Sequence, residues 1–236
     1  MRFMAFMTAL MFLASCQPEV TVEQRIAERE AAAQALIADC AATQCSVLDL
    51  DGQGIADYSV LNNLTHLKVL MISYTDFSDL NDIVGLTGLE ELHIGSTNVA
   101  DLTPLSNFSN LRLLHIQNTD FLNIGNLASL DKIEELAIGG NSLTDISFVR
   151  AMPKLKNLDI SNSDVADLSP LRGHPALETL AMEYAPVTDL SPLLQIRTLR
   201  QIGVVDPYGE DALAAQHELL RGRDIIVQYE AVMVVC

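Results

Sequence analysis

Apolar residues of this chain recur with a period of 22 residues between Cys45 and Gly203, without an insertion or deletion. Each repeat opens on one apolar residue and carries two more, three and five positions later. The opening residues are Cys45, Leu67, Leu89, Leu111, Ile133, Leu155, Leu177 and Leu199. A spacing kept through eight repeats predicts an array of equivalent structural turns rather than several unrelated folds.

The two later apolar positions of each repeat are separated by a single residue. This period-two spacing predicts a short strand whose apolar side chains face a core while the intervening residue faces outward. The pairs are Leu48/Leu50, Leu70/Ile72, Leu92/Ile94, Leu114/Ile116, Leu136/Ile138, Leu158/Ile160, Leu180/Met182 and Ile202/Val204. Because one such turn cannot bury its own apolar face, we expect the turns to stack and the strands to pair in parallel along a concave wall.

A second apolar group in each repeat, such as Val99 to Phe108, predicts a short helical turn on the opposite, convex side. Thr103, Ser169 and Ser191 each precede a proline, and we expect their hydroxyls to cap these turns. Aspartate recurs at positions 57, 79, 101, 145, 167 and 189, with Asn123 replacing it once. We interpret these carboxylates as acceptors for backbone amides rather than as a calcium ladder, since Asn123 would be a poorer calcium ligand.

Three segments share a motif: V-A-D-L-T-P-L at 99–105, V-A-D-L-S-P-L at 165–171 and V-T-D-L-S-P-L at 187–193. They resemble the repeats of internalin-type leucine-rich repeat proteins. The resemblance implies an α/β leucine-rich repeat solenoid with a parallel β-sheet on its concave face and short helical turns on its convex face. It also implies protein binding.

The asparagine that usually follows the strand in that family occurs here only as Asn141. Other repeats carry a hydroxyl or, once, an alanine at this position. We expect the hydroxyls to make some of the hydrogen bonds to buried backbone groups that an asparagine would make at this position. These residues are Thr75, Thr97, Thr119, Ser163 and Ala185.

The first 15 residues hold Arg2 followed by an apolar run, which predicts a secretory signal because the run is too short to span a bilayer. Leu13 to Cys16 resembles a bacterial lipobox. Cys16 would then be lipidated and begin the mature protein, with 16–20 as a tether, and Gln17 would favour the outer membrane. A plain cleaved signal peptide is the alternative.

Residues 21–44 are predicted to form a helical N-terminal cap on the array. Thr21 and Gln24 fit a capping box, and an apolar stripe follows at helical spacing. The alternative is an amphipathic helix that binds a partner. The stripe consists of Val22, Ile26, Ala33, Ile37 and Cys40.

Three cysteines remain once Cys16 is assigned to lipid. Cys40 and Cys45 lie at the helix end and the first strand, so we expect a disulfide between them in an oxidising compartment. Cys236 lies at the far end of the array, beyond the ~7 Å limit between bridged alpha carbons, and is left free or intermolecular.

The repeat array is predicted to occupy 45–205, and 206–236 is predicted to be a C-terminal cap. This cap consists of a turn at 206–209, a helix from Glu210 to Arg221 and a strand at Ile225 to Val227. The apolar residues 232–235 would form a last edge strand or a tail.

The formal net charge is −17, so phosphate backbones are repelled and nucleic acid is not an expected partner. Membrane association would depend on the acyl chains of Cys16 alone. No phosphate loop, nucleophile elbow or zinc-helix motif occurs, and we interpret His66, His174 and His217 as surface residues. We therefore expect no enzyme, no cofactor and no metal.

The outward positions of the strands carry apolar residues that core packing does not explain, with acidic residues and histidines around them. His93 and His115 would be neighbours, close enough to share a metal or to make binding sensitive to pH, although an ordinary polar surface is the simpler interpretation. The predicted binding patch consists of Met71, Tyr74, Glu91, His93, Leu113, His115, Glu135, Asp159 and Tyr184.

The leading functional hypothesis is a monomeric, non-catalytic interaction module, lipid-anchored in a bacterial envelope, that binds a protein or peptide on its concave face. The alternative is a structural envelope spacer or assembly protein that contacts partners through its caps or sides. An enzyme that depends on His93 or His115 is a third hypothesis.

Overall fold

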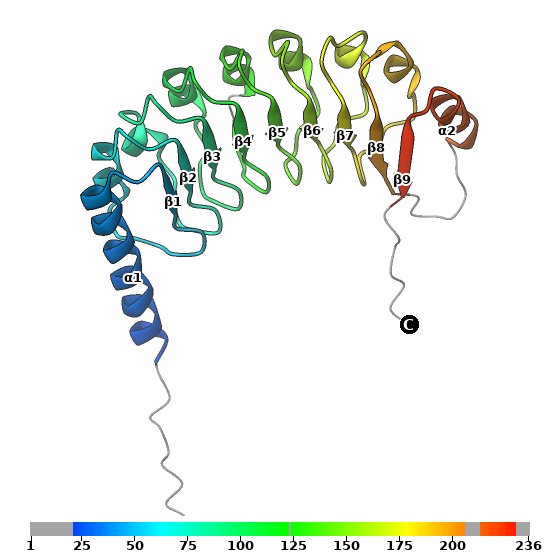
Figure 1. The fold of residues 1–236 in the computed structure, drawn as a ribbon. Helices are drawn as coiled ribbons and strands as arrows, with labels where there is room; N and C mark the ends of the chain where they lie inside the picture. The colour runs from blue at the N-terminus through cyan, green and yellow to red at the C-terminus, as the bar shows by residue number, and fades with distance from the viewer. Residues whose placement is uncertain (1–20, 123, 206–212, 230–236) are drawn as a thin grey trace, which may run out of the picture.

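The protein folds into an arched solenoid built on one parallel β-sheet, seen in a computed structural model that describes residues 21–122, 124–205 and 213–229 (Figure 1). The nine strands follow one another in sequence order across the sheet. This arrangement confirms the predicted leucine-rich repeat fold. The strands are β1 (Val47–Asp49), β2 (Val69–Met71), β3 (Glu91–His93), β4 (Leu113–His115), β5 (Glu135–Ala137), β6 (Asn157–Asp159), β7 (Thr179–Ala181), β8 (Gln201–Val204) and β9 (Ile226–Tyr229).

Each strand of the array pairs with the next at the repeat spacing. Leu70 lies opposite Leu92, and His93 lies opposite His115. The last pair departs from this spacing, because Gln201 of β8 lies opposite Ile226 of β9. The predicted frame of the repeats is therefore correct from β1 to β8.

The inward side chains of all repeats form one continuous core. Leu70, Leu92, Leu114 and Leu136 are each 0% exposed, as are Phe77 and Phe108 on the way to the convex side. Each fully buried leucine contributes about 2 kcal/mol of transfer free energy. Stacking supplies this burial, since a single turn would leave one side of each leucine in water.

The convex side is formed by single 3-10 turns. At the start of six of the seven described turns, an aspartate of the preceding loop accepts a backbone N–H, as Asp167 does from Ser169 at 2.8 Å. The predicted role of these aspartates is thus confirmed at all six positions. The turns are η1 (Tyr58–Asn63), η2 (Leu80–Ile83), η3 (Thr103–Asn107), η4 (Ile124–Ser129), η5 (Ser147–Ala151), η6 (Ser169–Leu171) and η7 (Ser191–Gln195).

The predicted hydroxyl caps at Thr103, Ser169 and Ser191 are wrong. Each of these residues is the first residue of its turn, so its own backbone N–H needs an acceptor and its hydroxyl cannot supply one. The hydroxyl of Ser169 instead donates to Asp167 at 2.8 Å. Asn123 lies outside the described residues.

A buried polar ladder follows the strands, as the hydroxyls at this position led us to expect. Thr97 Oγ1 donates to the carbonyl of Ile94 at 2.7 Å, and Ser163 Oγ donates to Ile160 at 2.6 Å. Asn141 does more, since its Oδ1 accepts from Thr119 N at 2.6 Å and its Nδ2 donates to Ile138 O at 2.8 Å. The ladder therefore pairs backbone groups that the strands leave unmatched.

The first helix, α1 (Val22–Thr43), covers the β1 end of the core with only part of its length. The expected capping box is present, with Gln24 N donating to Thr21 Oγ1 at 3.2 Å. Cys40 is buried, but Val22 and Ile26 are 72% and 60% exposed. The predicted apolar stripe is therefore wrong at its start, because a helix about 33 Å long extends past the end of the sheet (Figure 1).

The expected disulfide joins Cys40 to Cys45, whose alpha carbons are 4.8 Å apart. It ties the end of α1 to the start of the array. At the other end, α2 (Ala214–Arg221) packs beside β9 and η7. Neither α1 nor α2, the α-helices of the described residues, combines the length and apolarity that crossing a membrane requires.

Several predictions concern segments outside the described residues. These are the signal sequence, the lipidation of Cys16, the tether, the turn at 206–209, the apolar end at 232–235 and the pairing of Cys236.

Candidate functional site

The concave wall displays three rows of outward residues along the eight repeats. We call them the concave rows: the first residue of each strand, the third residue, and the residue two positions later. In the second repeat these are Val69, Met71 and Ser73. The inward leucines hold the backbone of each repeat in place, so the rows form a regular surface whose side chains are free of core packing.

Just beyond each strand from β1 to β7, the backbone turns through a left-handed residue. The positions are Gly52, Tyr74, Ser96, Asn118, Gly140, Asn162 and Tyr184, with φ between 53° and 72°. From Gly52 to Asn162, their N–H groups continue the ladder between repeats; that of Tyr74 donates to Gly95 O at 3.0 Å. The recurring Gly, Asn and Ser could have predicted this turn, which sequence reasoning missed.

Two of the left-handed residues are tyrosines. A bulky side chain in this region of φ and ψ costs about 1 kcal/mol relative to glycine. Tyr74 is nevertheless 73% exposed and Tyr184 is 53% exposed, so little packing offsets that cost. Strained, exposed aromatic residues are a recognised feature of binding sites.

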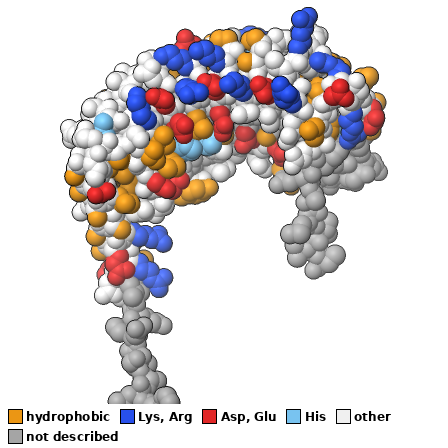
Figure 2. Space-filling view, in the orientation of Figure 1, with side chains coloured by type: hydrophobic (Ala, Val, Ile, Leu, Met, Phe, Trp, Pro, Cys, Tyr) orange, Lys and Arg blue, Asp and Glu red, His pale blue; other side chains and the backbone are white. Residues whose placement is uncertain are grey.

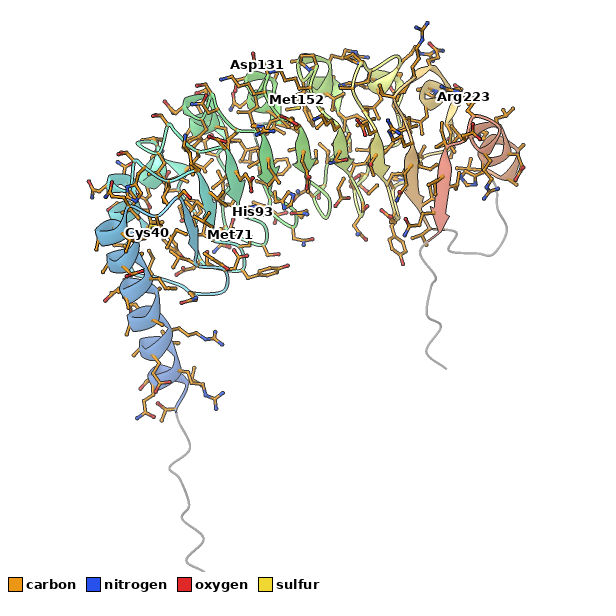
Figure 3. All side chains as sticks on the ribbon, viewed as in Figure 1. Cys40, Met71, His93, Asp131, Met152 and Arg223 are labelled. Atoms are coloured by element: carbon orange, nitrogen blue, oxygen red, sulfur yellow. A yellow bond between two sulfur atoms is a disulfide. The ribbon has the colours of Figure 1, made fainter. Side chains whose placement is uncertain are left out.

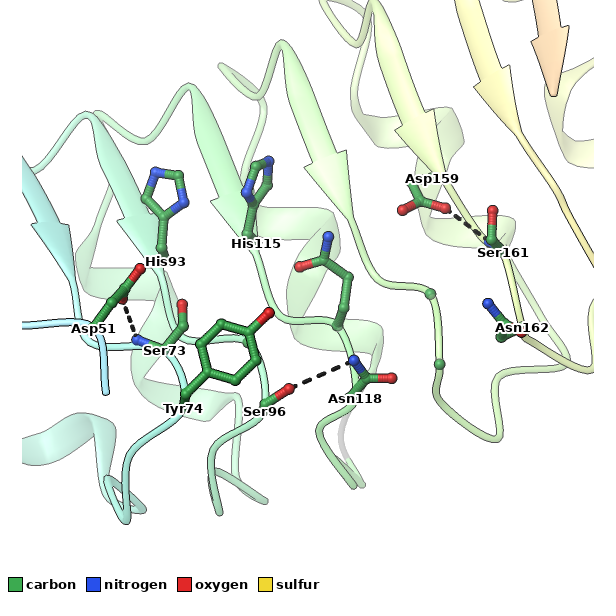
Figure 4. Close-up of a pocket in the computed structure, with 14 residues that line it drawn as sticks. Asp51, Ser73, Tyr74, His93, Ser96, His115, Asn118, Asp159, Ser161 and Asn162 are labelled. Atoms are coloured by element: carbon green, nitrogen blue, oxygen red, sulfur yellow. Dashed lines mark hydrogen bonds between the residues drawn. The ribbon is translucent and has the colours of Figure 1, made fainter. Parts of the chain in front are cut away.

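A polar groove of about 410 Å³ follows the ends of the strands from the first repeat to the sixth. Tyr74 extends from its turn toward Ser96 of the next repeat, with His93 and His115 on the sheet beside them (Figure 4). The groove is lined by Asp51, Ser73, Tyr74, His93, Gly95, Ser96, His115, Gln117, Asn118, Gly139, Gly140, Asp159, Ser161 and Asn162.

The two histidines are in contact at the centre of the groove. Their ring centroids are 4.6 Å apart in an edge-to-face arrangement, and His115 Nε2 lies 2.9 Å from Glu135 Oε1. Burial lowers the pKa of His93, and the neighbouring His115 lowers it further, against the opposing effect of Asp51, Glu91 and Glu135. His93 is therefore held mainly in its neutral form at neutral pH.

The predicted patch is divided between the groove and the sheet beside it. Tyr74, His93, His115 and Asp159 line the groove. The remaining residues lie outside its lining, four on strands β2 to β5 and one in the turn after β7. These are Met71, Glu91, Leu113, Glu135 and Tyr184.

The prediction missed most of the groove because it followed the strands and included only Tyr74 and Tyr184 from the turns beyond them. Asp51, Gln117, Asn118 and Asn162 all belong to the turns that follow the strands. Asn118 and Asn162 share the repeat position of the predicted Tyr74 and Tyr184, and this shared position was the available signal for them.

Charge is distributed unequally over the molecule. The concave rows carry six carboxylates and no lysine or arginine. In Figure 2 acidic and histidine side chains occupy the hollow, while basic side chains gather along the upper rim. The six carboxylates belong to Asp49, Asp51, Glu91, Glu135, Asp159 and Glu183.

The basic residues of the rim alternate with acidic ones at a single repeat position, immediately before each strand from β2 to β8. The observed pairs include Lys68 with Glu90 at 3.1 Å and Glu134 with both Arg112 at 2.8 Å and Lys156 at 2.7 Å. Sequence reasoning missed this rim ladder, although the alternation is visible in the sequence. The full series is Lys68, Glu90, Arg112, Glu134, Lys156, Glu178 and Arg200.

Two of the three histidines interpreted as surface residues are buried, and that interpretation is wrong for them. His174 is 6% exposed and His217 is 3% exposed. His174 Nε2 lies 3.1 Å from Met152 O, and His174 Nδ1 accepts a hydrogen bond from Leu177 N at 3.1 Å. It closes a convex turn from inside the core, and burial lowers its pKa.

One group of three metal-ligating side chains occurs in the part of the chain that the structure describes: Cys40, Cys45 and His66. His66 Nε2 lies 3.8 Å from Cys40 Sγ. Both sulfurs belong to the disulfide, so neither is available as a thiolate ligand.

Solved structures from two bacteria resemble the chain. Internalin C2 from Listeria monocytogenes is 30% identical, over 67% of this chain and 70% of that protein, with a TM-score of 0.64. The internalin inlF from the same species is 21% identical, over 88% of this chain and 64% of that one, with a TM-score of 0.67.

A leucine-rich repeat protein from Leptospira interrogans is 17% identical, over 78% of this chain and 48% of that one, with a TM-score of 0.63. The chain thus spans less than two thirds of two of these three proteins. No family model and no curated protein matches the sequence.

Proposed function

The chain belongs to the internalin-like leucine-rich repeat proteins, and on that premise we propose that it is a non-catalytic module that binds a protein or peptide on its concave face. The observation that carries the proposal is the groove of about 410 Å³ that adjoins the strained and exposed Tyr74. Neither the groove nor the tyrosine contributes to the core. A rigid sheet that presents unpacked side chains has the geometry of a docking surface.

Met71 and Leu113 add apolar area to this surface. Each is an outward residue, on β2 and β4, and each is half-buried beside Glu91 and the histidine pair. Apolar residues surrounded by polar ones are typical of protein interfaces.

The side chains of the groove favour binding over catalysis. Ser161 donates to Glu183, and Ser96 Oγ accepts from Asn118 at 3.5 Å. Among the described residues, no groove hydroxyl donates to His93 or His115, so the pairing of nucleophile and base that acyl transfer requires is missing from this arrangement.

The location that we propose is the bacterial envelope, with export directed by 1–15 and a lipid anchor on Cys16. The support is the apolar run that ends in Leu13 to Cys16. The tether at 16–20 would hold the solenoid close to the membrane, with 21–44 as N-terminal cap, 45–205 as array and 206–236 as C-terminal cap. Mass spectrometry of the mature N-terminus tests the anchor, and an unmodified N-terminus elsewhere would reject it.

A second candidate function is that of an envelope spacer that contacts partners through its ends. The exposed Val22 and Ile26 at the start of α1 favour it, since they present apolar surface that the core does not cover. In this case the concave face would be an ordinary polar surface.

Affinity capture from solubilised envelopes separates the two functions. The concave variant Glu91→Lys/Glu135→Lys reverses two charges on the sheet. The matched control Asp131→Lys/Asp164→Lys reverses two exposed charges outside the concave rows; Asp131 lies on the convex side, away from Met71 and His93 (Figure 3). We expect a specific partner to be lost with the concave variant alone. Unchanged capture would reject concave recognition in favour of the ends.

A further inference from the structure

The strongest unexplained feature of the concave face is that its charge has one sign. The concave rows hold six carboxylates and no basic residue, although the chain has 14 lysines and arginines. Four of those basic residues belong to the rim ladder, where acidic neighbours pair with them. Among the described residues, none of the carboxylates of the concave rows pairs with a lysine or arginine, and Glu135 has the imidazole of His115 at 2.9 Å.

Backbone amides hold two of these carboxylates in position at opposite ends of the groove. Asp51 Oδ1 accepts from Ser73 N at 2.6 Å, and Asp159 Oδ1 accepts from Ser161 N at 2.9 Å. Within the described residues, no hydrogen bond reaches the second oxygen of either side chain. Each aspartate therefore presents a second carboxylate oxygen, held in a fixed position, that can accept a hydrogen bond from a ligand.

Tyr74 adds an aromatic face at the Asp51 end of the groove. Its side chain is 73% exposed, and its backbone is held in place by the left-handed turn and by the bond from its N–H to Gly95 O. A lysine or arginine near such a ring gains a cation–π interaction in addition to its ion pair. The left-handed strain at this position costs stability that the ring does not regain by packing.

The side chains that line the groove favour a basic ligand over an acidic or an apolar one. A groove of about 410 Å³ has room for one or two long side chains, and its walls are carboxylates, amides, hydroxyls and two imidazoles. An acidic ligand would meet repulsion from Asp51 and Asp159. An apolar ligand would leave these oxygens dehydrated and unpaired, which is costly.

We infer that the concave groove accepts a basic segment of its partner, with one lysine or arginine side chain between Tyr74 and the carboxylate of Asp51. A second basic side chain of the same segment lies against the carboxylate of Asp159, about 24 Å further along the sheet. The inference rests on the concave face being the binding site. The partner is thus a protein or peptide with a cationic surface.

Peptide binding tests the inference directly. Three fluorescent nine-residue peptides of alternating serine and a second residue are compared by anisotropy: the second residue is arginine, its neutral analogue citrulline, or glutamate. We expect the arginine peptide to bind the wild-type protein at least about tenfold more tightly than the citrulline peptide, and the glutamate peptide not to bind.

The groove variant Asp51→Asn/Asp159→Asn should weaken binding of the arginine peptide by about tenfold. Asparagine keeps an oxygen that can accept from Ser73 N and Ser161 N, so the fold is retained, and an unchanged melting curve verifies this. The control Asp131→Asn/Asp164→Asn removes the same charge outside the concave rows and should leave the affinity unchanged. Tyr74→Ala should weaken binding by a smaller factor, about threefold.

Two outcomes would overturn the inference. One is equal binding of the arginine and citrulline peptides, which would show that cationic charge is not recognised. The other is equal weakening by the groove and control variants, which would show a response to net charge alone.

Failure of the inference and failure of the proposed function give different results. If the concave charge reversals abolish capture of the natural partner but the arginine peptide does not bind, the inference fails and concave recognition stands. If the arginine peptide binds at the groove while capture is unaffected by the reversals, the proposed function fails.

Discussion

His93 and His115 lie on adjacent strands with their rings edge to face and their centroids 4.6 Å apart. Protonating both rings would place two positive charges in contact. The pKa of His93 is lowered by burial and then by His115, while Asp51, Glu91 and Glu135 oppose the shift. The folded protein therefore binds fewer protons on His93 than the unfolded chain does near pH 6.

This proton difference predicts a loss of stability in acid. The contribution of His93 is fully present above the unfolded-state pKa of about 6.5 and is lost as the pH falls from there through the folded-state pKa. Urea unfolding at pH 7.5 and pH 5 should show a smaller acid-induced loss for His93→Gln than for wild type. Part of the acid-induced loss of stability remains in that variant, because burial also lowers the pKa of His174. Identical losses in both proteins would contradict the prediction.

The rim ladder predicts a stability contribution that depends on salt. Glu134 accepts from Arg112 and Lys156, and these bonds lower its pKa to about 2. We expect Glu134→Gln to lower Tm by about 2 °C at low ionic strength and by almost nothing in 1 M salt, where the pairs are screened.

The same carboxylate has a predictable pH dependence. Because its folded-state pKa is depressed, its stabilisation is present above the unfolded-state value of about 4.5 and is lost as the pH falls toward about 2. Asp131→Asn, which removes an exposed carboxylate outside the ladder, is the control. A salt-independent difference between Glu134→Gln and wild type would show that the side chain acts by packing instead.

Asn141 is predicted to be the most costly position of the polar ladder to truncate. It is 6% exposed and joins two repeats through bonds to Thr119 N and Ile116 O, at 2.6 and 3.1 Å, besides its bond to Ile138 O. Asn141→Ala leaves these groups buried without a partner and should cost about 3 kcal/mol of unfolding free energy.

Asn141→Thr provides the comparison for that measurement. Threonine occupies this position in other repeats and donates to the carbonyl three residues earlier, as Thr97 does. It cannot supply the acceptor for Thr119 N, so an intermediate loss is expected in urea titration. Equal losses for Ala and Thr would mean that the bond to Thr119 accounts for the whole effect.

Tyr74 is predicted to strengthen partner binding and to lower the stability of the fold. Tyr74→Gly removes a left-handed tyrosine that is 73% exposed, and should raise the unfolding free energy by up to about 1 kcal/mol while weakening partner capture. Ser78→Gly, at an exposed position without a positive φ, should lower stability instead. A loss of stability in Tyr74→Gly would show that the ring packs productively.

Much of the fold followed from local spacing alone. The offset between Leu70 and Leu92 in the sequence is the offset of their pairing in the sheet. The left-handed turn at Tyr74 was not predicted, because tyrosine has no preference for that conformation and the ladder bond to Gly95 imposes it. The burial of His174 was missed for a similar reason, since its acceptor on Met152 comes from the preceding repeat.

The sequence by itself determined the stacking of repeats and the adjacency of His93 and His115, because a constant repeat length permits only one alignment of neighbouring turns. Only the tertiary structure decided that Asp51 and Asp159 line the same groove. It also decided that the start of α1 extends beyond the core, with its apolar side chains exposed. Those relationships depend on the curvature of the sheet and on the width of its end, which no single repeat encodes.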